Sequence, residues 1–226
     1  MELQKETKAH GRWYDDACGT AFGLELIGER WSLLVVRELM LGGRRFTDLR
    51  ESLPGISAKV LTERLTALEH HGVLSRRQLP RPSVAQVYEL TEWGYRAEPV
   101  IQELGRWAAM SSAHDPTLPL SPVSLMLSMR TMFVPAKAIG LSVEVGFVIA
   151  GEEFVAAVRN GLLSIVREDV GATPAVIRAQ SAPPIAALVY LGPESEEADP
   201  ANLVVEGDRS AVMRYAGLFE LPPPLA

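Results

Sequence analysis

The sequence predicts two domains of different fold class: a mainly α-helical domain, followed by an α+β domain with an antiparallel sheet. Apolar residues recur three and four positions apart in the first half, as on one face of a helix, whereas they alternate after Ser142, as along a strand. The intervening residues 111–122 are rich in proline and serine and break the helical pattern. We therefore expect one domain at 1–112 and another at 134–226, joined through 113–133 by a linker and a helix that leads into the second domain.

The composition favours a globular, cytoplasmic protein. Of the 226 residues, 47% are hydrophobic, which is enough apolar surface for packed cores. No run approaches the roughly eighteen apolar residues that a membrane-spanning helix needs, and the first ten residues are charged, unlike a signal peptide. The single cysteine, Cys18, cannot form a disulfide within the chain, so stability must come from packing.

Four helices are expected before the first strand. Ser57 is placed to cap the fourth helix and Gly72 to end it in a left-handed conformation. Thr47 is the candidate cap of the third, which the Pro54-Gly55 pair ends. The apolar face of the fourth helix is formed by Val60, Leu61, Leu65 and Leu68, and the four helices span residues 17–27, 31–41, 46–53 and 58–71.

A basic hairpin follows these helices. Its strand-like runs, 73–79 and 85–90, are joined by the proline-stiffened segment 80–83. Thr91 is placed to cap a last helix that runs to about residue 110, with Trp93, Val100, Leu104 and Trp107 on or near one stripe. A short helix, a Pro-Gly turn, a capped helix and a basic hairpin together form a winged helix-turn-helix, in which one helix braces another in the major groove of duplex DNA.

Charge separates along the chain although the net charge is −6. Residues 41–84 hold eight basic and four acidic side chains, a net charge of +4, whereas seven basic and twelve acidic side chains from Pro116 onward give −5. Because DNA binding requires Lys and Arg to displace phosphate counterions, we expect the first domain to bind DNA. The expected contact residues are Arg44, Arg45, Ser57, Lys59, Thr62, Glu63, Arg64, Thr66, Arg76, Arg77 and Arg81.

A merely solvated surface is the alternative interpretation of these arginines, because this is the usual fate of a charge run. The ordered helices and hairpin around them favour DNA binding. Lys59 and Thr62 could contact bases or only phosphates, and the sequence leaves both open.

The first half resembles the HxlR-type winged-helix regulators, relatives of the MarR group. The resemblance covers residues 18–107 and implies a homodimer, paired through the first and last helices of the domain, that binds a palindromic operator. Five ordered motifs support it: Trp31-Ser32-Leu33-Leu34, Gly43-Arg44-Arg45-Phe46, Leu53-Pro54-Gly55-Ile56-Ser57, Leu61-Thr62-Glu63-Arg64-Leu65 and Tyr88-Glu89-Leu90-Thr91-Glu92-Trp93-Gly94.

Cys18 stands at the start of the first helix, where the positive end of the helix dipole can lower the pKa of a thiol. Members of the HxlR-type family often have a cysteine at this place and some use it to sense oxidants, so the resemblance implies a redox sensor. The alternative is a small buried apolar side chain. No second cysteine is present to form an intramolecular disulfide.

Short strands and glycines dominate the second domain. Residues 142–150, 153–159 and 162–167 are expected to form an antiparallel meander, followed by a strand at 174–179, a helix at 184–191, a strand at 202–206 and a capped helix at 208–218.

The second domain is similar to a sterol-carrier-protein-like domain over about residues 134–221. The similarity lies in Gly151-Glu152-Glu153-Phe154, Asn160-Gly161-Leu162-Leu163-Ser164, Leu203-Val204-Val205-Glu206 and Gly207-Asp208-Arg209-Ser210-Ala211-Val212-Met213 with Leu218-Phe219. It implies a sheet backed by helices around an apolar cavity that accepts a lipid-like molecule. The candidate pocket residues are Met126, Met129, Met132, Phe133, Phe147 and Phe154, for which ordinary core or dimer contact is the alternative.

The expected function is that of a sequence-specific transcription regulator, a homodimeric repressor whose operator binding is modulated by an apolar ligand. The sequence has no Gly-rich phosphate loop, no Cys/His cluster with metal-ligand spacing and no nucleophile motif, so we expect neither an enzyme nor a metal or other cofactor. The alternative is a lipid-binding, carrier-like protein in which the winged helix is an interaction module. The basic hairpin argues against this alternative.

Overall fold

The computed structural model describes residues 14–79, 85–116, 118–198 and 201–225. The chain divides into two compact units, one made of residues up to Leu39 together with Gly43–Arg96, the other of Met40–Gly42 together with Ala97–Ala226. Each unit has its own core of buried apolar side chains.

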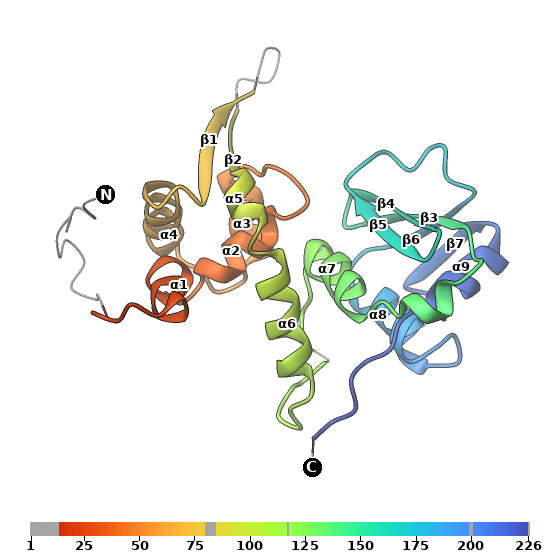
Figure 1. The fold of residues 1–226 in the computed structure, drawn as a ribbon. Coiled ribbons are helices and arrows are strands. Elements are labelled where there is room, and N and C mark those ends of the chain that lie inside the picture. Colours follow the sequence, from red (N-terminus) through yellow and green to blue (C-terminus); the bar gives the residue numbers. More distant parts are fainter. Residues whose placement is uncertain (1–13, 80–84, 117, 199–200, 226) are drawn as a thin grey trace. The chain divides into compact units, whose positions relative to one another are not determined.

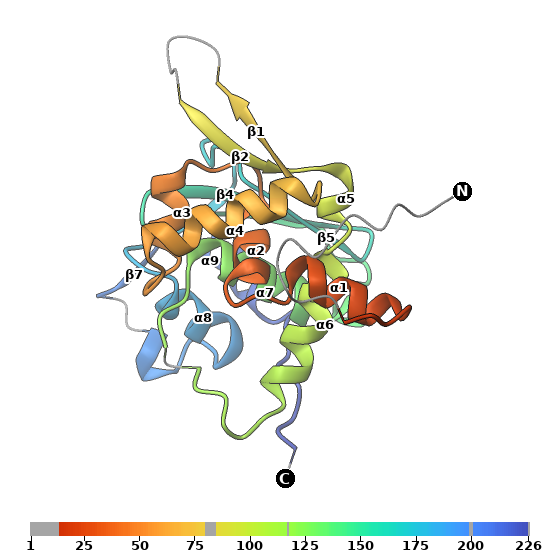
Figure 2. The same ribbon diagram turned by 90° about the vertical axis from the view of Figure 1, so that its left-hand side faces the viewer.

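Helices and a two-stranded hairpin make up the first unit, and the hairpin extends away from the helices (Figure 1). Helix α2 contacts both α3 and α4, and its Val35, Val36 and Leu39 are fully buried. Helix α4, seen from the side in Figure 2, buries Leu61, Leu65 and Leu68 of the predicted apolar face, and Val60 is half-buried. The elements are α1 (Gly19–Ile27), α2 (Ser32–Leu39), α3 (Phe46–Ser52), α4 (Ala58–His70), β1 (Leu74–Gln78), β2 (Gln86–Leu90) and α5 (Glu92–Tyr95).

Most of the predicted helix ends are confirmed. The Ser57 hydroxyl accepts a hydrogen bond from the Val60 N–H at 3.2 Å, and Gly72 follows α4 with a φ of +72°. The Thr47 cap is wrong, because Thr47 lies inside α3. That helix begins after Arg45, whose N–H donates to the Asp48 carboxylate at 3.2 Å.

The last helix expected in the first half is two helices. Thr91 caps α5, as predicted, by accepting from the Gly94 N–H at 3.0 Å, but α5 ends at Tyr95 and a second helix, α6 (Glu98–Ala109), follows. Pro99 explains the break, since in a continuous helix its ring would clash with the carbonyl of Tyr95. Pro99 instead lies in the first turn of α6, where a missing N–H has no cost.

Helix α6 belongs to the second unit because it packs against α7 (Pro122–Met132). The compact units therefore divide beside Arg96, whereas the sequence places the domain boundary after residue 112. The proline-rich segment 111–122 connects two helices of one unit.

A five-stranded sheet, with strand order β5-β4-β3-β6-β7, forms the centre of the second unit within the described residues. Helices α7, α8 and α9 pack against its strands. The elements after α7 are a short 3₁₀ helix η1 (Pro135–Ala138), β3 (Val143–Ile149), β4 (Glu152–Arg159), β5 (Leu162–Val166), β6 (Ala175–Ala179), α8 (Pro183–Tyr190), η2 (Glu196–Ala198), β7 (Leu203–Gly207) and α9 (Arg209–Ala216).

The sheet is mixed, which corrects the predicted antiparallel sheet. Strands β3, β4 and β5 form the predicted meander, but β6 lies parallel to β3, with Phe147 opposite Ile177. Parallel neighbours need a crossover, and here it is the segment between β5 and β6. A Cβ added at Gly146 would lie 2.6 Å from the Thr173 hydroxyl and 2.8 Å from a Val170 carbon, so the crossover packs directly on β3 at this glycine.

Candidate nucleic-acid interface

One face of α4 is polar and exposed. Lys59, Thr62, Glu63 and Thr66, here called the α4 face, are spaced three, four and seven residues apart and are all exposed. Leu61, Leu65 and Leu68 on the other side are buried. An ammonium, two hydroxyls and a carboxylate can donate to and accept from base edges in a major groove. The sequence predicted this arrangement, and the structure brings the four residues together on one surface.

Helix α4 is held from several sides of its own unit, since it contacts α1, α2 and β1. Arg64 makes one of these attachments: its guanidinium lies 3.1 Å from the Glu29 carboxylate and 3.7 Å from that of Glu63. The side chain is only 18% exposed. In this position Arg64 braces the helix within its own unit, and its expected contact with DNA stays a prediction.

Arg44 is the clearest departure from the expected contacts, because it is 5% exposed. Its guanidinium lies 3.5 Å from the fully buried carboxylate of Glu38, which also accepts two hydrogen bonds from Arg37. The Arg44 backbone exchanges hydrogen bonds of 2.9 and 2.8 Å with Tyr88. Arg44 therefore joins the segment before α3 to the hairpin, and in this position its charge is shielded from a phosphate.

The hairpin arginines are exposed and paired with carboxylates. Arg76 donates to Glu69 at the end of α4, and these hydrogen bonds raise the pKa of Arg76 and lower that of Glu69. Arg77 lies 2.8 Å from Glu89 on the neighbouring strand. Exposed pairs contribute only about 0–1 kcal/mol, so DNA phosphates can displace these carboxylates. Arg45 is exposed as well, whereas Arg81 lies outside the described residues.

Trp31 has an unusual backbone conformation that the sequence did not reveal. Its φ is +80°, rare for a bulky residue, although the sequence offers glycine at position 28 of the same turn. Arg30 stacks over the indole ring at 5.3 Å. The same turn presents Glu29 to α4. A glycine or asparagine at position 31 would have been the usual signal.

Cys18 is exposed and directly precedes α1. Hydrogen bonds from the backbone N–H groups of Thr20 and Ala21, together with the Thr20 hydroxyl, hold the pKa of its thiol below the ordinary value. The exposure contradicts the alternative of a buried apolar side chain. A reactive thiol stays a prediction.

The candidate pocket residues lie in the core of the second unit. Five of the six are buried, and Phe133 is half-buried against Phe219 with ring centres 6.0 Å apart. This placement agrees with the alternative of ordinary core packing, and ligand contact by these residues stays a prediction.

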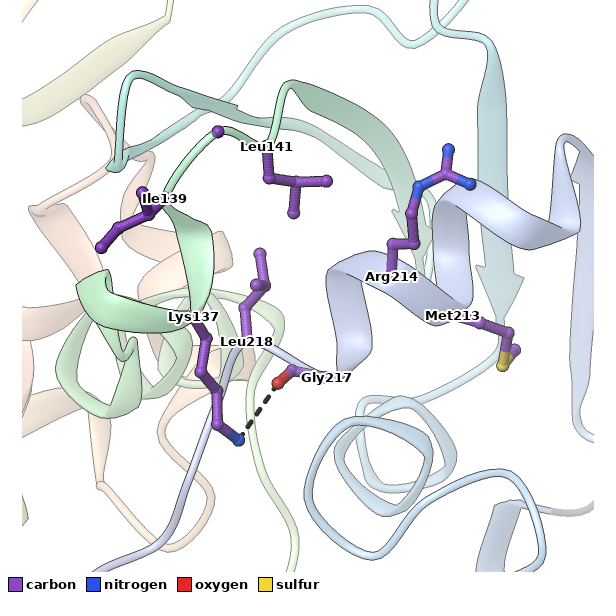
Figure 3. Close-up of a pocket in the computed structure, with 8 residues that line it drawn as sticks. Lys137, Ile139, Leu141, Met213, Arg214, Gly217 and Leu218 are labelled. Carbon is purple, nitrogen blue, oxygen red and sulfur yellow. Dashed lines mark hydrogen bonds between the residues drawn. The ribbon is translucent and has the colours of Figure 1, made fainter.

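A surface hollow of about 490 Å³ opens elsewhere on the second unit (Figure 3). Apolar and cationic side chains share its wall, and Lys137 donates to the Gly217 carbonyl at 3.2 Å. The hollow is an open depression of the surface rather than an enclosed cavity. The lining residues are Lys137, Ile139, Gly140, Leu141, Met213, Arg214, Gly217 and Leu218.

The described residues contain no group of three or more His, Cys, Asp or Glu side chains arranged to hold a metal ion. Within the same residues, none of the helices is long and apolar enough to cross a membrane.

Comparison with known proteins identifies relatives of the first half. The HxlR-like helix-turn-helix family matches residues 26–115. The chain is 42% identical over 83 residues to the HTH-type transcriptional regulator YodB of Bacillus subtilis, covering 37% of this chain and 74% of that protein. It is 31% identical over 111 residues to the uncharacterized HTH-type transcriptional regulator YtfH of Escherichia coli, covering 49% of this chain and 87% of the other. The solved structure of reduced YodB matches at 36% identity with a TM-score of 0.40, over 44% of this chain and all of that one.

Proposed function

The chain belongs to the family of HxlR-like helix-turn-helix proteins, and on this premise we propose that it is a cytoplasmic, homodimeric repressor that binds a palindromic DNA operator. Its relatives are named HTH-type transcriptional regulators, so it is a DNA-binding regulator of transcription, and proteins of this family are not enzymes. The single observation that carries the proposal is the α4 face, four exposed polar side chains opposite a buried apolar face.

Dimer formation is supported by two helices that leave apolar side chains exposed. None of the nine residues of α1 is buried, and Phe22 and Leu24 are exposed although the helix is strongly apolar. Helix α6 also has no buried residue, and Val100, Leu104 and Trp107, here called the α6 face, are exposed. Exposed apolar stripes at helical spacing are typical of surfaces that a protein partner covers. The resemblance assigns pairing to the first and last helices, and these helices fit that role.

A symmetric dimer presents two copies of α4, so a palindromic site follows from the two-fold axis. Consecutive half-sites read from one side of the duplex lie about 34 Å apart, one turn of DNA. An effector that changes the separation of the two α4 helices would therefore change operator affinity.

The second unit is the proposed effector-binding part. Its surface hollow combines apolar Ile139, Leu141 and Leu218 with the cations Lys137 and Arg214. Both cations already lie beside carboxylates, Lys137 at 2.7 Å from Glu220 and Arg214 at 3.6 Å from Asp208, so the lining suits an apolar molecule whose polar end can compete with these carboxylates. The sterol-carrier-like resemblance independently favours a lipid-like ligand.

The decisive experiment is fluorescence anisotropy of the purified protein on duplex from its own upstream region, with scrambled duplex of equal length as control. We expect selective binding whose log Kd rises with log salt concentration by about 0.9 for each phosphate contacted. Absence of binding to either duplex, with and without reductant, would refute the regulator proposal and favour the carrier-like alternative.

A further inference from the structure

Helix α6 packs on α7 of the second unit, yet its other side is bare. The three side chains of the α6 face are 53%, 45% and 70% exposed for Val100, Leu104 and Trp107. A helix with so much exposed apolar surface depends on other attachments to keep a fixed orientation. The structure provides such attachments at both of its ends.

The attachment at the start of α6 is the guanidinium of Arg130 on α7. One nitrogen donates to the Glu98 carboxylate at 2.7 Å, and the other donates to the carbonyl of Ile165 on β5. Glu98 accepts a further hydrogen bond, of 2.9 Å, from Gln102 in the next turn of α6. Arg130 and Glu98 are only 20% and 26% exposed, so water screens their pairing less than it screens an ion pair at the surface.

The end of α6 is attached to the last residues that the structure describes. The N–H of Leu225 donates to the carbonyl of Met110, the residue that ends α6, at 2.8 Å. The same segment is fixed to the core five residues earlier, where the Glu220 N–H donates to the Met132 carbonyl at 3.1 Å. Helix α6 is thus connected at its start to the sheet and at its end to the segment that follows α9.

From these contacts we propose that Arg130 is a positioning residue for dimerisation: it fixes α6 to the sheet of the second unit, so that this unit sets the orientation of the face that meets the second copy. The inference rests on the proposed homodimer and goes beyond it, because it gives the second unit a role in pairing. Arg130 thus links β5 directly to α6, in addition to the packing of α6 on α7. An effector bound to this unit has a physical route to the dimer in that side chain.

The test compares Arg130→Gln, Glu98→Gln, the double variant and Arg130→Lys with the wild-type full chain. Arg159→Gln is the matched control, because Arg159 makes a 2.7 Å pair with Glu144 on the surface of the same sheet. The dimer dissociation constant is measured by sedimentation, and amide hydrogen exchange is followed in α6, with β3 as an internal reference.

We expect Arg130→Gln to raise the dimer dissociation constant about tenfold, the equivalent of one lost hydrogen bond to a charged group, and to speed exchange in α6 but not in β3. The double variant should cost no more than Arg130→Gln alone, since the pair is already broken. Arg130→Lys should give an intermediate effect, because one ammonium can replace only one of the two contacts. Arg159→Gln should match the wild type.

Unchanged dissociation constant and α6 exchange in Arg130→Gln would overturn the inference, as would faster exchange in α6 and β3 alike, which indicates general destabilisation. A wild-type protein that stays monomeric at all concentrations would refute the homodimer and, with it, a role for Arg130 in pairing. In that case the exchange of α6 would still show whether Arg130 fixes the helix, so the two failures are distinguishable.

Discussion

The guanidinium of Arg64 and the carboxylate of Glu29 lie 3.1 Å apart, so an ion pair joins α4 to the turn between α1 and α2. The same turn contains the left-handed Trp31 with Arg30 stacked on its ring. The helix proposed to read DNA is therefore attached to the residues next to α1, one of the two helices proposed for the dimer seam.

Glu29→Gln tests whether Arg64 braces α4 or contacts DNA. Removing a negative charge should by itself strengthen DNA binding, but releasing Arg64 should loosen α4. We expect the second effect to win and operator affinity to fall about threefold, in keeping with the 0.2–1 kcal/mol of a partly exposed pair. Anisotropy titrations of Glu29→Gln and of Glu144→Gln, which removes the same charge from the second unit, measure this. Tighter binding by Glu29→Gln would show that operator binding does not depend on the Arg64–Glu29 pair.

Lys59→Ala should weaken operator binding by roughly tenfold, as expected for loss of one base or phosphate contact at the start of α4. Loss of a phosphate contact lowers the salt slope by about one and leaves specificity unchanged, whereas loss of a base contact changes the preferred sequence. Titrations on operator and single-base variants at two salt concentrations distinguish these. Arg159→Ala removes one positive charge from the second unit and should bind as the wild type does. Equal affinities for Lys59→Ala and the wild type would remove the α4 face from the interface.

Arg44→Ala should destabilise the first unit, because it removes one of the guanidinium groups that pair with the buried Glu38 carboxylate. Breaking a buried pair from one side costs about 3–5 kcal/mol, and we expect the lower end because Arg37 still donates to Glu38. Urea unfolding followed by tryptophan fluorescence provides the measurement, with the exposed Arg45→Ala as control. A fully stable Arg44→Ala protein that has lost operator binding would return Arg44 to the DNA contacts.

Cys18 should react with iodoacetamide at a lower pH than an ordinary thiol. Its folded pKa is depressed by the N–H groups of Thr20 and Ala21, so the thiolate is more populated near neutral pH than in the unfolded chain. The measurement is the alkylation rate against pH for native and urea-unfolded protein, with Cys18→Ser as blank. Coinciding profiles would contradict the prediction. If Cys18 also senses oxidants, peroxide will change the operator affinity of the wild type and not of Cys18→Ser.

Trp107→Glu should convert the proposed dimer to monomer over the micromolar range. Tryptophan in the centre of an apolar interface commonly contributes about 2 kcal/mol or more, and a buried carboxylate adds a desolvation cost. Sedimentation at several concentrations, with the exposed Leu191→Glu as control, would reveal the change. A Trp107→Glu protein that dimerises like the wild type would place the seam elsewhere.

The sequence predicted the positions of the helices and strands better than it predicted which of them pack or pair with one another. Apolar periodicity located α4, β3 and α9 because it reports burial within one element. It could not reveal that β6 runs parallel to β3, since hairpin-like spacing does not determine which distant strands pair. The break before α6 could have been predicted from Pro99, because a proline ring clashes with the carbonyl four residues earlier in a continuous helix.

The same limit applies to the candidate site. The α4 face follows from helical spacing, but the fate of each arginine depends on a carboxylate from another element: Glu38 for Arg44, Glu29 for Arg64 and Glu69 for Arg76. These pairs are six, thirty-five and seven residues apart in the chain, so counting basic residues overstated the positive surface.

The carboxylates of Glu69 and Glu89, beside Arg76 and Arg77, also bear on how the protein would find its target among many other sequences. In the proposed complex each arginine would reach DNA already paired with a carboxylate, so fewer counterions would be released per contact than the number of arginines suggests. Weak attachment to arbitrary sequence leaves more of the protein free to sample the genome. Occupancy of the correct site then depends on base contacts that only that site can supply.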